Sequence, residues 1–185
     1  MAHRVCPWWK GYLLLSPLRR LRESPSKMLR PWVREGMTVL EPGPGMGFFT
    51  LDLARLVGPS GRVVAVDLQE RMLTRLRRRA RRRGLADRIE LRLGHGESLG
   101  IDDLLGRVDL CVAIHVTHEM PDAGLFFREV GGALTGGGEV LLVEPPDHVS
   151  ETELDEMLVA AEEGGLEVVR RPVEGNPRSA LLRRR

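Results

Sequence analysis

The sequence predicts an α/β protein whose mostly parallel sheet is covered by helices on both faces. Short β-rich runs alternate with helical stretches from Met37 onward, and Gly and Pro residues separate them. The expected strands are Thr38–Glu41, Val63–Asp67, Ile89–Leu93, Leu110–Ile114 and Val140–Val143. The expected helices lie near residues 47–57, 69–83, 121–134 and 150–164. Strands and helices that alternate in this way form right-handed βαβ units.

The end of the chain follows a different pattern. Residues 166–173 and 179–184 are expected to be two strands joined by a turn at Gly175-Asn176-Pro177, so the last pair is antiparallel. Upstream, the three glycines at 136–138 are expected to form a loop.

A length of 185 residues suits one domain. Residues 1–36 precede the first strand and are expected to form an N-terminal helical or lid segment, with residues 37–185 as the main domain. No apolar run approaches the ~20 residues that span a bilayer, and the start lacks the core of a signal peptide. Cys6 and Cys111 have no metal or disulfide spacing. We therefore expect a cytoplasmic protein without a structural metal.

The net charge of +2 conceals a split along the chain. Residues 1–100 carry 20 Lys/Arg against 9 Asp/Glu, and residues 101–185 carry 8 against 17. Eight arginines fall between Arg71 and Arg83, a run without an aromatic residue. Nucleic-acid-binding surfaces interleave basic with aromatic groups around a site. We therefore interpret the run as a solvated helix face and regard a nucleic-acid partner as unlikely.

The strongest motif is the glycine-rich segment TVLEPGPGMGFFT at residues 38–50. Its spacing is G-x-G-x-G, and Phe48 stands where a dinucleotide fingerprint needs glycine. Asp67 ends the second expected strand, 20 residues after Gly47, where a carboxylate accepts hydrogen bonds from ribose hydroxyls. Glycine loop and distal acid together predict a nucleoside-containing cofactor.

These motifs resemble the class I S-adenosylmethionine-dependent methyltransferases. The resemblance rests on the acid before the glycine loop, on Asp67, and on GGALTGGGEVLLVEP before a final hairpin, and it covers residues 37–185. It implies a three-layer αβα Rossmann-like sandwich with a seven-stranded sheet, and S-adenosyl-L-methionine as the cofactor.

The resemblance also implies which residues hold the cofactor. Glu41 contacts its amino acid portion, Asp67 the ribose and Leu68 the adenine. In place of the family's adenine-contacting Asp, this chain has His95, followed by Gly96 and Glu97. The full implied set is Glu41, Gly43, Gly45, Gly47, Asp67, Leu68, His95, Gly96, Glu97 and His115.

Candidate catalytic residues follow the fourth expected strand. His118 has a side chain suited to general-base chemistry near neutral pH, with His115 and Glu119 beside it. The alternative is that His115 is a shelf under the cofactor and that His118 or Glu119 only starts a helix. The pattern does not match the His-Glu-x-x-His zinc motif, so no metal is expected.

The acceptor is predicted from what the chain lacks. No D/N-P-P-Y/F motif follows the fourth strand, which disfavours adenine amines and glutamine amides. From the length of 185 residues we also expect no appended module for recognising a macromolecule. A small-molecule methyl acceptor is favoured; the alternatives are an RNA- or protein-directed methyltransferase and a non-catalytic cofactor-binding protein. Trp8, Trp9 and Tyr12 form either an aromatic wall for the substrate or a hydrophobic anchor. The oligomeric state stays open.

Overall fold

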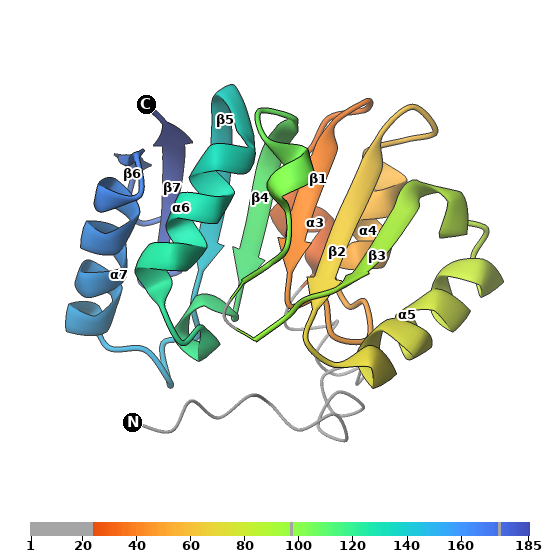
Figure 1. Cartoon of the computed structure of the whole chain (residues 1–185), viewed down its shortest axis with the longest axis horizontal. Coiled ribbons are helices and arrows are strands. Elements are labelled where there is room, and N and C mark those ends of the chain that lie inside the picture. Colours follow the sequence, from red (N-terminus) through yellow and green to blue (C-terminus); the bar gives the residue numbers. More distant parts are fainter. Residues whose placement is uncertain (1–23, 97, 174) are drawn as a thin grey trace. The chain divides into compact units, whose positions relative to one another are not determined.

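The computed structural model describes residues 24–96, 98–173 and 175–185, and the chain divides at residue 95 into two compact units (Figure 1). The seven strands are those of the expected mixed sheet, in which β7 is antiparallel to its neighbours β5 and β6. The predicted fold class is therefore confirmed.

The first unit, before residue 95, holds three parallel strands with β2 in the middle. The strands are β1 Thr38–Pro42, β2 Arg62–Asp67 and β3 Ile89–Leu93. The helices are α3 Pro25–Leu29, α4 Thr50–Leu56, α5 Glu70–Arg82 and the 3-10 turn η1 Ala86–Arg88. Helix α4 packs on β2, and α5 packs on β2 and β3. Strands β1 and β2 are buried along almost their whole length, as parallel strands covered by helices are.

The register of β1 and β2 positions the two predicted acids of this unit. Pro42 lies opposite Val66, so both strands end at one edge of the sheet. Glu41 and Asp67 therefore stand at neighbouring carboxyl ends, where open α/β sheets bind ligands.

Helix α4 begins at Thr50, three residues later than the predicted start near residue 47. Gly47 has φ +81°, which a right-handed helix cannot include. The prediction of the start was wrong because the glycine turn extends further than the hydrophobic pattern suggested.

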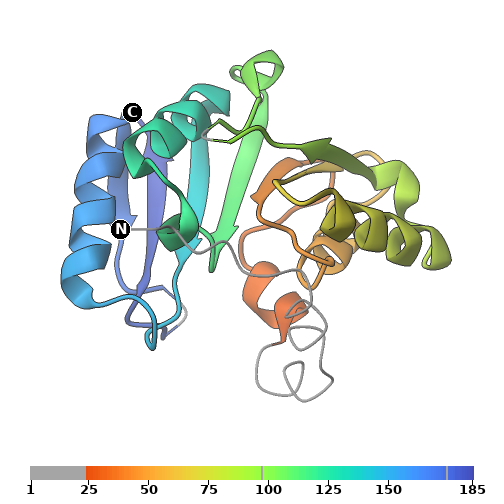
Figure 2. The ribbon, with the colours of Figure 1, turned by 60° about the horizontal axis from the view of Figure 1, so that its bottom comes forward.

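The second unit, from residue 95 on, holds four strands in the order β4-β5-β7-β6. They are β4 Val108–Ile114, β5 Leu134–Val143, β6 Leu166–Arg170 and β7 Ser179–Arg184. The other elements are α6 Ala123–Ala133, α7 Glu151–Glu163 and the 3-10 turns η2 Asp102–Leu104 and η3 Thr117–Glu119. Helices α6 and α7 lie side by side (Figures 1 and 2). Strands β4 and β5 are parallel, so both end at the same edge.

Two strand boundaries in this unit differ from the predictions by three residues or more. Strand β5 begins at Leu134 and includes the glycines expected to form a loop; the pairing with β4 jumps from Leu134 to Glu139, so the intervening residues bulge. Strand β6 ends at Arg170, not at Val173, because Pro172 has no N–H for a ladder hydrogen bond.

Of the N-terminal segment 1–36, the described part contains α3, which contacts α4. Residues 1–23 lie outside the described residues, so the helical or lid segment stays a prediction. Across the described part of the chain, no helix is both long and apolar enough to cross a membrane.

Candidate functional site

The glycine loop of the first unit turns through three left-handed residues. Gly43, Gly45 and Gly47 have φ of +64°, +53° and +81°, a region that only glycine occupies without a steric penalty. The Gly43 N–H donates to Val66 O at 2.9 Å, which joins the loop to the end of β2. The expected loop geometry is therefore present between β1 and α4.

Two of these glycines have different surroundings. A Cβ on Gly47 would lie 2.3 Å from Leu76 Cδ1, so this position keeps α5 close to the loop. A Cβ on Gly45 would meet nothing within 4 Å, so the space next to this residue is open. An open space beside a bare backbone allows a ligand to approach the main chain closely.

Glu41 is the most unusual acid of the first unit. Its side chain is 4% exposed, and no described residue hydrogen-bonds Oε2. Burial raises the pKa of Glu41 to about 8, and the charge of Asp67 adds to the rise. The Thr50 hydroxyl opposes the rise, although Thr50 Oγ1 also lacks a hydrogen bond of ordinary geometry. A buried acid of this kind is suited to pair with a cation that the protein itself does not supply.

Asp67 is held in one orientation by the backbone. Its Oδ2 accepts from Gly45 N at 3.1 Å, and its Oδ1 accepts from Gln69 N at 2.8 Å. Each oxygen of the carboxylate is thereby fixed, one by the glycine loop and one by the start of α5. Leu68, the residue after it, has a 40% exposed side chain.

Arg79 is a functional neighbour that the sequence analysis missed. Its guanidinium donates to the carbonyl oxygens of Met46 and Gly47, the second at 3.1 Å. The interpretation of the whole arginine run as a solvated face was wrong at this position, because Arg79 is half-buried and ties α5 to the glycine loop.

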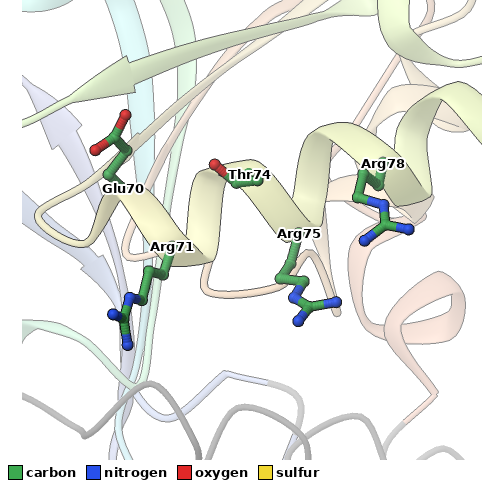
Figure 3. A pocket seen from close by; sticks show the side chains of 5 residues that line it. All are labelled: Glu70, Arg71, Thr74, Arg75 and Arg78. Atoms are coloured by element: carbon green, nitrogen blue, oxygen red, sulfur yellow. The ribbon is translucent and has the colours of Figure 1, made fainter.

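Other arginines of α5 do lie at the surface. Figure 3 shows the side chains of Arg71, Arg75 and Arg78 extending from the helix. They line a hollow of about 520 Å³. Among the described residues, Glu70 and Thr74 complete its lining, and all five of these residues belong to α5. This hollow does not include Glu41 or Asp67.

In the second unit, His95 and Gly96 are exposed residues of a turn closed by hydrogen bonds between His95 and Ser98. Glu97 lies outside the described residues. His115 follows β4 with φ +58°, and within the described ranges no other non-glycine residue has positive φ. Its N–H donates to Val143 O at 2.8 Å. Such strained positions are concentrated at functional sites.

The structure joins His118 to Glu144, a residue that the sequence analysis did not select. The distance from His118 Nδ1 to Glu144 Oε2 is 2.6 Å, and Glu144 is fully buried at the end of β5. Hydrogen bonding to Glu144 raises the pKa of His118, and the charges of Glu144, Glu119 and Glu153 add to this against the effect of burial. The available signal was a carboxylate at the carboxyl end of a buried strand, where Asp67 also stands.

Several predicted features lack a structural test. Trp8, Trp9 and Tyr12, the expected substrate wall, lie outside the described residues, as does Cys6. Cys111 is buried in β4. Within residues 24–96, 98–173 and 175–185, no group of three or more His, Cys, Asp or Glu is placed to hold a metal ion.

Comparison with known proteins finds similarity to methyltransferases in both sequence and structure. A family model described as a methyltransferase domain matches residues 33–171. The chain is 35% identical over 113 residues to the ubiquinone/menaquinone biosynthesis C-methyltransferase UbiE of Hahella chejuensis, and 30% identical over 112 residues to that of Pasteurella multocida. These matches cover 60% of this chain but only 44% and 41% of the relatives, so the chain spans less than half of their length.

Two solved structures show the same fold. An S-adenosylmethionine-dependent methyltransferase from Aquifex aeolicus superposes with a TM-score of 0.82 at 24% identity and covers 97% of both chains. An S-adenosylmethionine-dependent O-methyltransferase from Thermotoga maritima gives a TM-score of 0.68 at 21% identity, covering 92% of this chain and 71% of that one.

Proposed function

Because the chain belongs to the methyltransferase domain family, we propose that it transfers a methyl group from S-adenosylmethionine to a small-molecule acceptor. The observation that carries the proposal is the buried Glu41 carboxyl, whose Oε2 has no hydrogen-bond partner among the described residues. The names of the curated relatives, which refer to quinone biosynthesis, support a small-molecule acceptor.

Glu41 fits the amino acid portion of this cofactor. An isolated buried carboxylate is unfavourable, and a bound ammonium group would supply both the missing charge and a donor for Oε2. The open space at Gly45 would admit the same portion against the backbone. Gly43 and Gly47 would shape the loop around it.

Asp67 fits the ribose. A carboxylate that the backbone holds by both oxygens can accept hydrogen bonds from two neighbouring hydroxyls with little loss of conformational entropy. Leu68 is exposed next to it and offers apolar contact for the adenine. His95, Gly96, Glu97 and His115 remain proposed cofactor contacts, and His115 is supported by its strained backbone.

The cofactor, when bound, supplies an electrophilic methyl group on a sulfonium. The residues of this chain contribute binding and orientation, which provide much of the rate in a displacement with a good leaving group. Glu119 remains a proposed neighbour of the reaction through its charge on His118.

Isothermal titration calorimetry tests the proposal. We expect binding of S-adenosylmethionine and of its demethylated product, with Asp67→Ala weakening both by about tenfold or more, the loss of charge-assisted hydrogen bonds. Asp87→Ala is the matched control, since Asp87 is an exposed acid of the same unit. Preferential binding of NAD, or equal affinity of the two variants, would contradict the proposal.

A further inference from the structure

His118 and Glu144 form a pair that the fold creates and the proposed cofactor site does not use. His118 belongs to η3, which follows β4, and Glu144 directly follows β5. Since β4 and β5 are parallel, with Ile114 opposite Val143, the carboxyl ends of the two strands lie together. This brings His118 Nδ1 to 2.6 Å from Glu144 Oε2, although the two residues are 26 positions apart in the sequence.

The carboxylate of Glu144 is held rigidly. It is fully buried, and its Oε1 accepts from Thr117 N at 2.8 Å and from His118 N at 3.4 Å, a weaker contact. Its main chain is also tied, because its N–H donates to Arg178 O and its carbonyl accepts from Asn176 Nδ2. Oε2 is therefore presented to the imidazole in a fixed position.

This contact determines which nitrogen of His118 carries the hydrogen. An ionised carboxylate can only accept, so Nδ1 is the donor, and in the neutral ring Nε2 holds the lone pair. The side chain is 21% exposed, and within the described part of the chain no group hydrogen-bonds Nε2. A partly exposed imidazole oriented by a buried carboxylate is the arrangement of a general base.

We infer that His118 is the general base of the proposed methyl transfer, that Glu144 positions its ring, and that the acceptor is a phenol or enol. This inference rests on the proposed function. A phenol or enol hydroxyl is largely protonated near neutral pH, so the nucleophilic phenolate or enolate forms only when a base removes the proton. An acceptor that is already an anion would have no use for the pair.

The step is balanced. The O–H proton passes to Nε2 of His118 and leaves a phenolate or enolate, which forms a bond to the methyl carbon through oxygen or through the neighbouring carbon. The sulfur–methyl bond breaks, and its electron pair stays on the sulfur. Attack through carbon gives a dienone from a phenolate, which then loses its ring proton to solvent and takes up a proton on oxygen; from an enolate it gives the ketone directly. The imidazolium formed is paired with Glu144 until it returns its proton to water.

The surroundings of His118 favour that imidazolium. Glu144 faces it from the end of β5, Glu119 from η3 and Glu153 from α7, and the His148 ring lies 6.1 Å from its own ring. The three acids raise the pKa of His118. Because the base acts only when unprotonated, the rate of transfer rises with pH through this raised pKa and levels off above it.

The first experiment measures the pair without an acceptor. In the full chain, NMR titration of the His118 ring gives its pKa and its tautomer, and we expect the neutral ring to be protonated on Nδ1. Glu144→Gln should lower the pKa of His118, since it removes the charge. Glu156→Gln, the same change at an exposed position of α7, should leave it unchanged. An unchanged pKa in the Glu144→Gln variant would overturn the inference.

The second experiment uses two probe acceptors, 2-naphthol as the hydroxyl acid and thiocyanate as an anion without a proton. We expect methylation of 2-naphthol, with the product distinguishing attack through oxygen from attack through carbon. His118→Asn should reduce it by about 10²–10⁴-fold, the usual contribution of a general base, and should leave the affinity for S-adenosylmethionine unchanged. In the Glu144→Gln variant, the rate of 2-naphthol methylation should rise at a lower pH, because the pKa of His118 is lower, and should level off at a lower value.

Other outcomes separate the two proposals. Thiocyanate methylation without 2-naphthol methylation, an equal loss with both probes in His118→Asn, or no methylation by a protein that binds S-adenosylmethionine would each overturn the inference alone. Failure to bind S-adenosylmethionine would overturn the proposed function and the inference with it. Glu144→Gln tests the inference independently if His118→Asn does not fold.

Discussion

Glu41 should couple cofactor binding to proton release, because its pKa lies at about 8 in the protein without a cation beside it. At pH 7 this carboxyl is mostly protonated, and an ammonium group bound next to it would favour the ionised form. We therefore predict that binding of S-adenosylmethionine releases a proton at pH 7 and that its affinity rises with pH up to about 8. Calorimetry in buffers of different ionisation enthalpy measures the release.

The control for this prediction is Glu41→Gln, which should bind more weakly and release no proton. Release that persists in this variant would assign the proton to another group.

Gly45→Ala and Gly47→Ala form a matched pair of single-residue substitutions. Both have positive φ, so alanine strains the backbone at either position by roughly 1 kcal/mol. Gly47→Ala also drives a Cβ against Leu76, whereas Gly45→Ala only fills the open space. We predict that Gly47→Ala lowers the melting temperature more, while Gly45→Ala retains more stability and loses affinity for S-adenosylmethionine. Thermal unfolding together with calorimetry tests this; an equal loss of stability would contradict the packing argument.

At the scale of secondary-structure elements, helix α5 has one arginine, Arg79, that hydrogen-bonds the glycine loop, and other arginines that lie exposed on the surface of the helix. Arg79→Gln removes the charged donor to the Met46 and Gly47 carbonyls, so it loosens the glycine loop and should weaken binding of S-adenosylmethionine by about tenfold. Arg78→Gln, the neighbouring change at an exposed position, should leave the affinity unchanged. Calorimetry compares the affinities of the two variants for S-adenosylmethionine. An equal loss of affinity in both would mean that the net charge of α5 controls binding and that the hydrogen bonds of Arg79 do not.

Arg79 and Glu144 show what the sequence could not predict. The short β-rich runs predicted the strands, and the glycine spacing with Asp67 predicted the proposed cofactor residues of the first unit. The run of arginines has no internal mark that distinguishes Arg79, because its role depends on which helix face meets the loop. Glu144 reaches His118 only through the pairing of β4 with β5. The start of β5 was missed because glycines favour a loop locally, while pairing with β4 at Val108 and from Leu110 on holds them in a bulged strand.

For the whole molecule, the buried acid that serves binding should cost stability. The pKa of Glu41 is raised from 4.5 to about 8, so between these values the unfolded chain ionises this group and the folded chain does not. The free energy of unfolding therefore falls as pH rises through this window, by on the order of a few kcal/mol, and is not affected by Glu41 below it. Glu41→Gln should be more stable than the wild type at pH 8 and similar to it at pH 4.

Bound cofactor should narrow the difference in stability between the two proteins at pH 8. At a hundredfold excess over its dissociation constant, S-adenosylmethionine should stabilise the wild type by about 2.7 kcal/mol, or roughly 5–10 °C in melting temperature for a domain of this size. The variant, which lacks the carboxylate that pairs with the ammonium, should gain much less at the same concentration. Urea unfolding of both proteins at pH 4 and pH 8, with and without S-adenosylmethionine, measures these differences in the free energy of unfolding. If the variant is less stable than the wild type at pH 8 without cofactor, Glu41 holds the fold together and is not a group kept for the ligand.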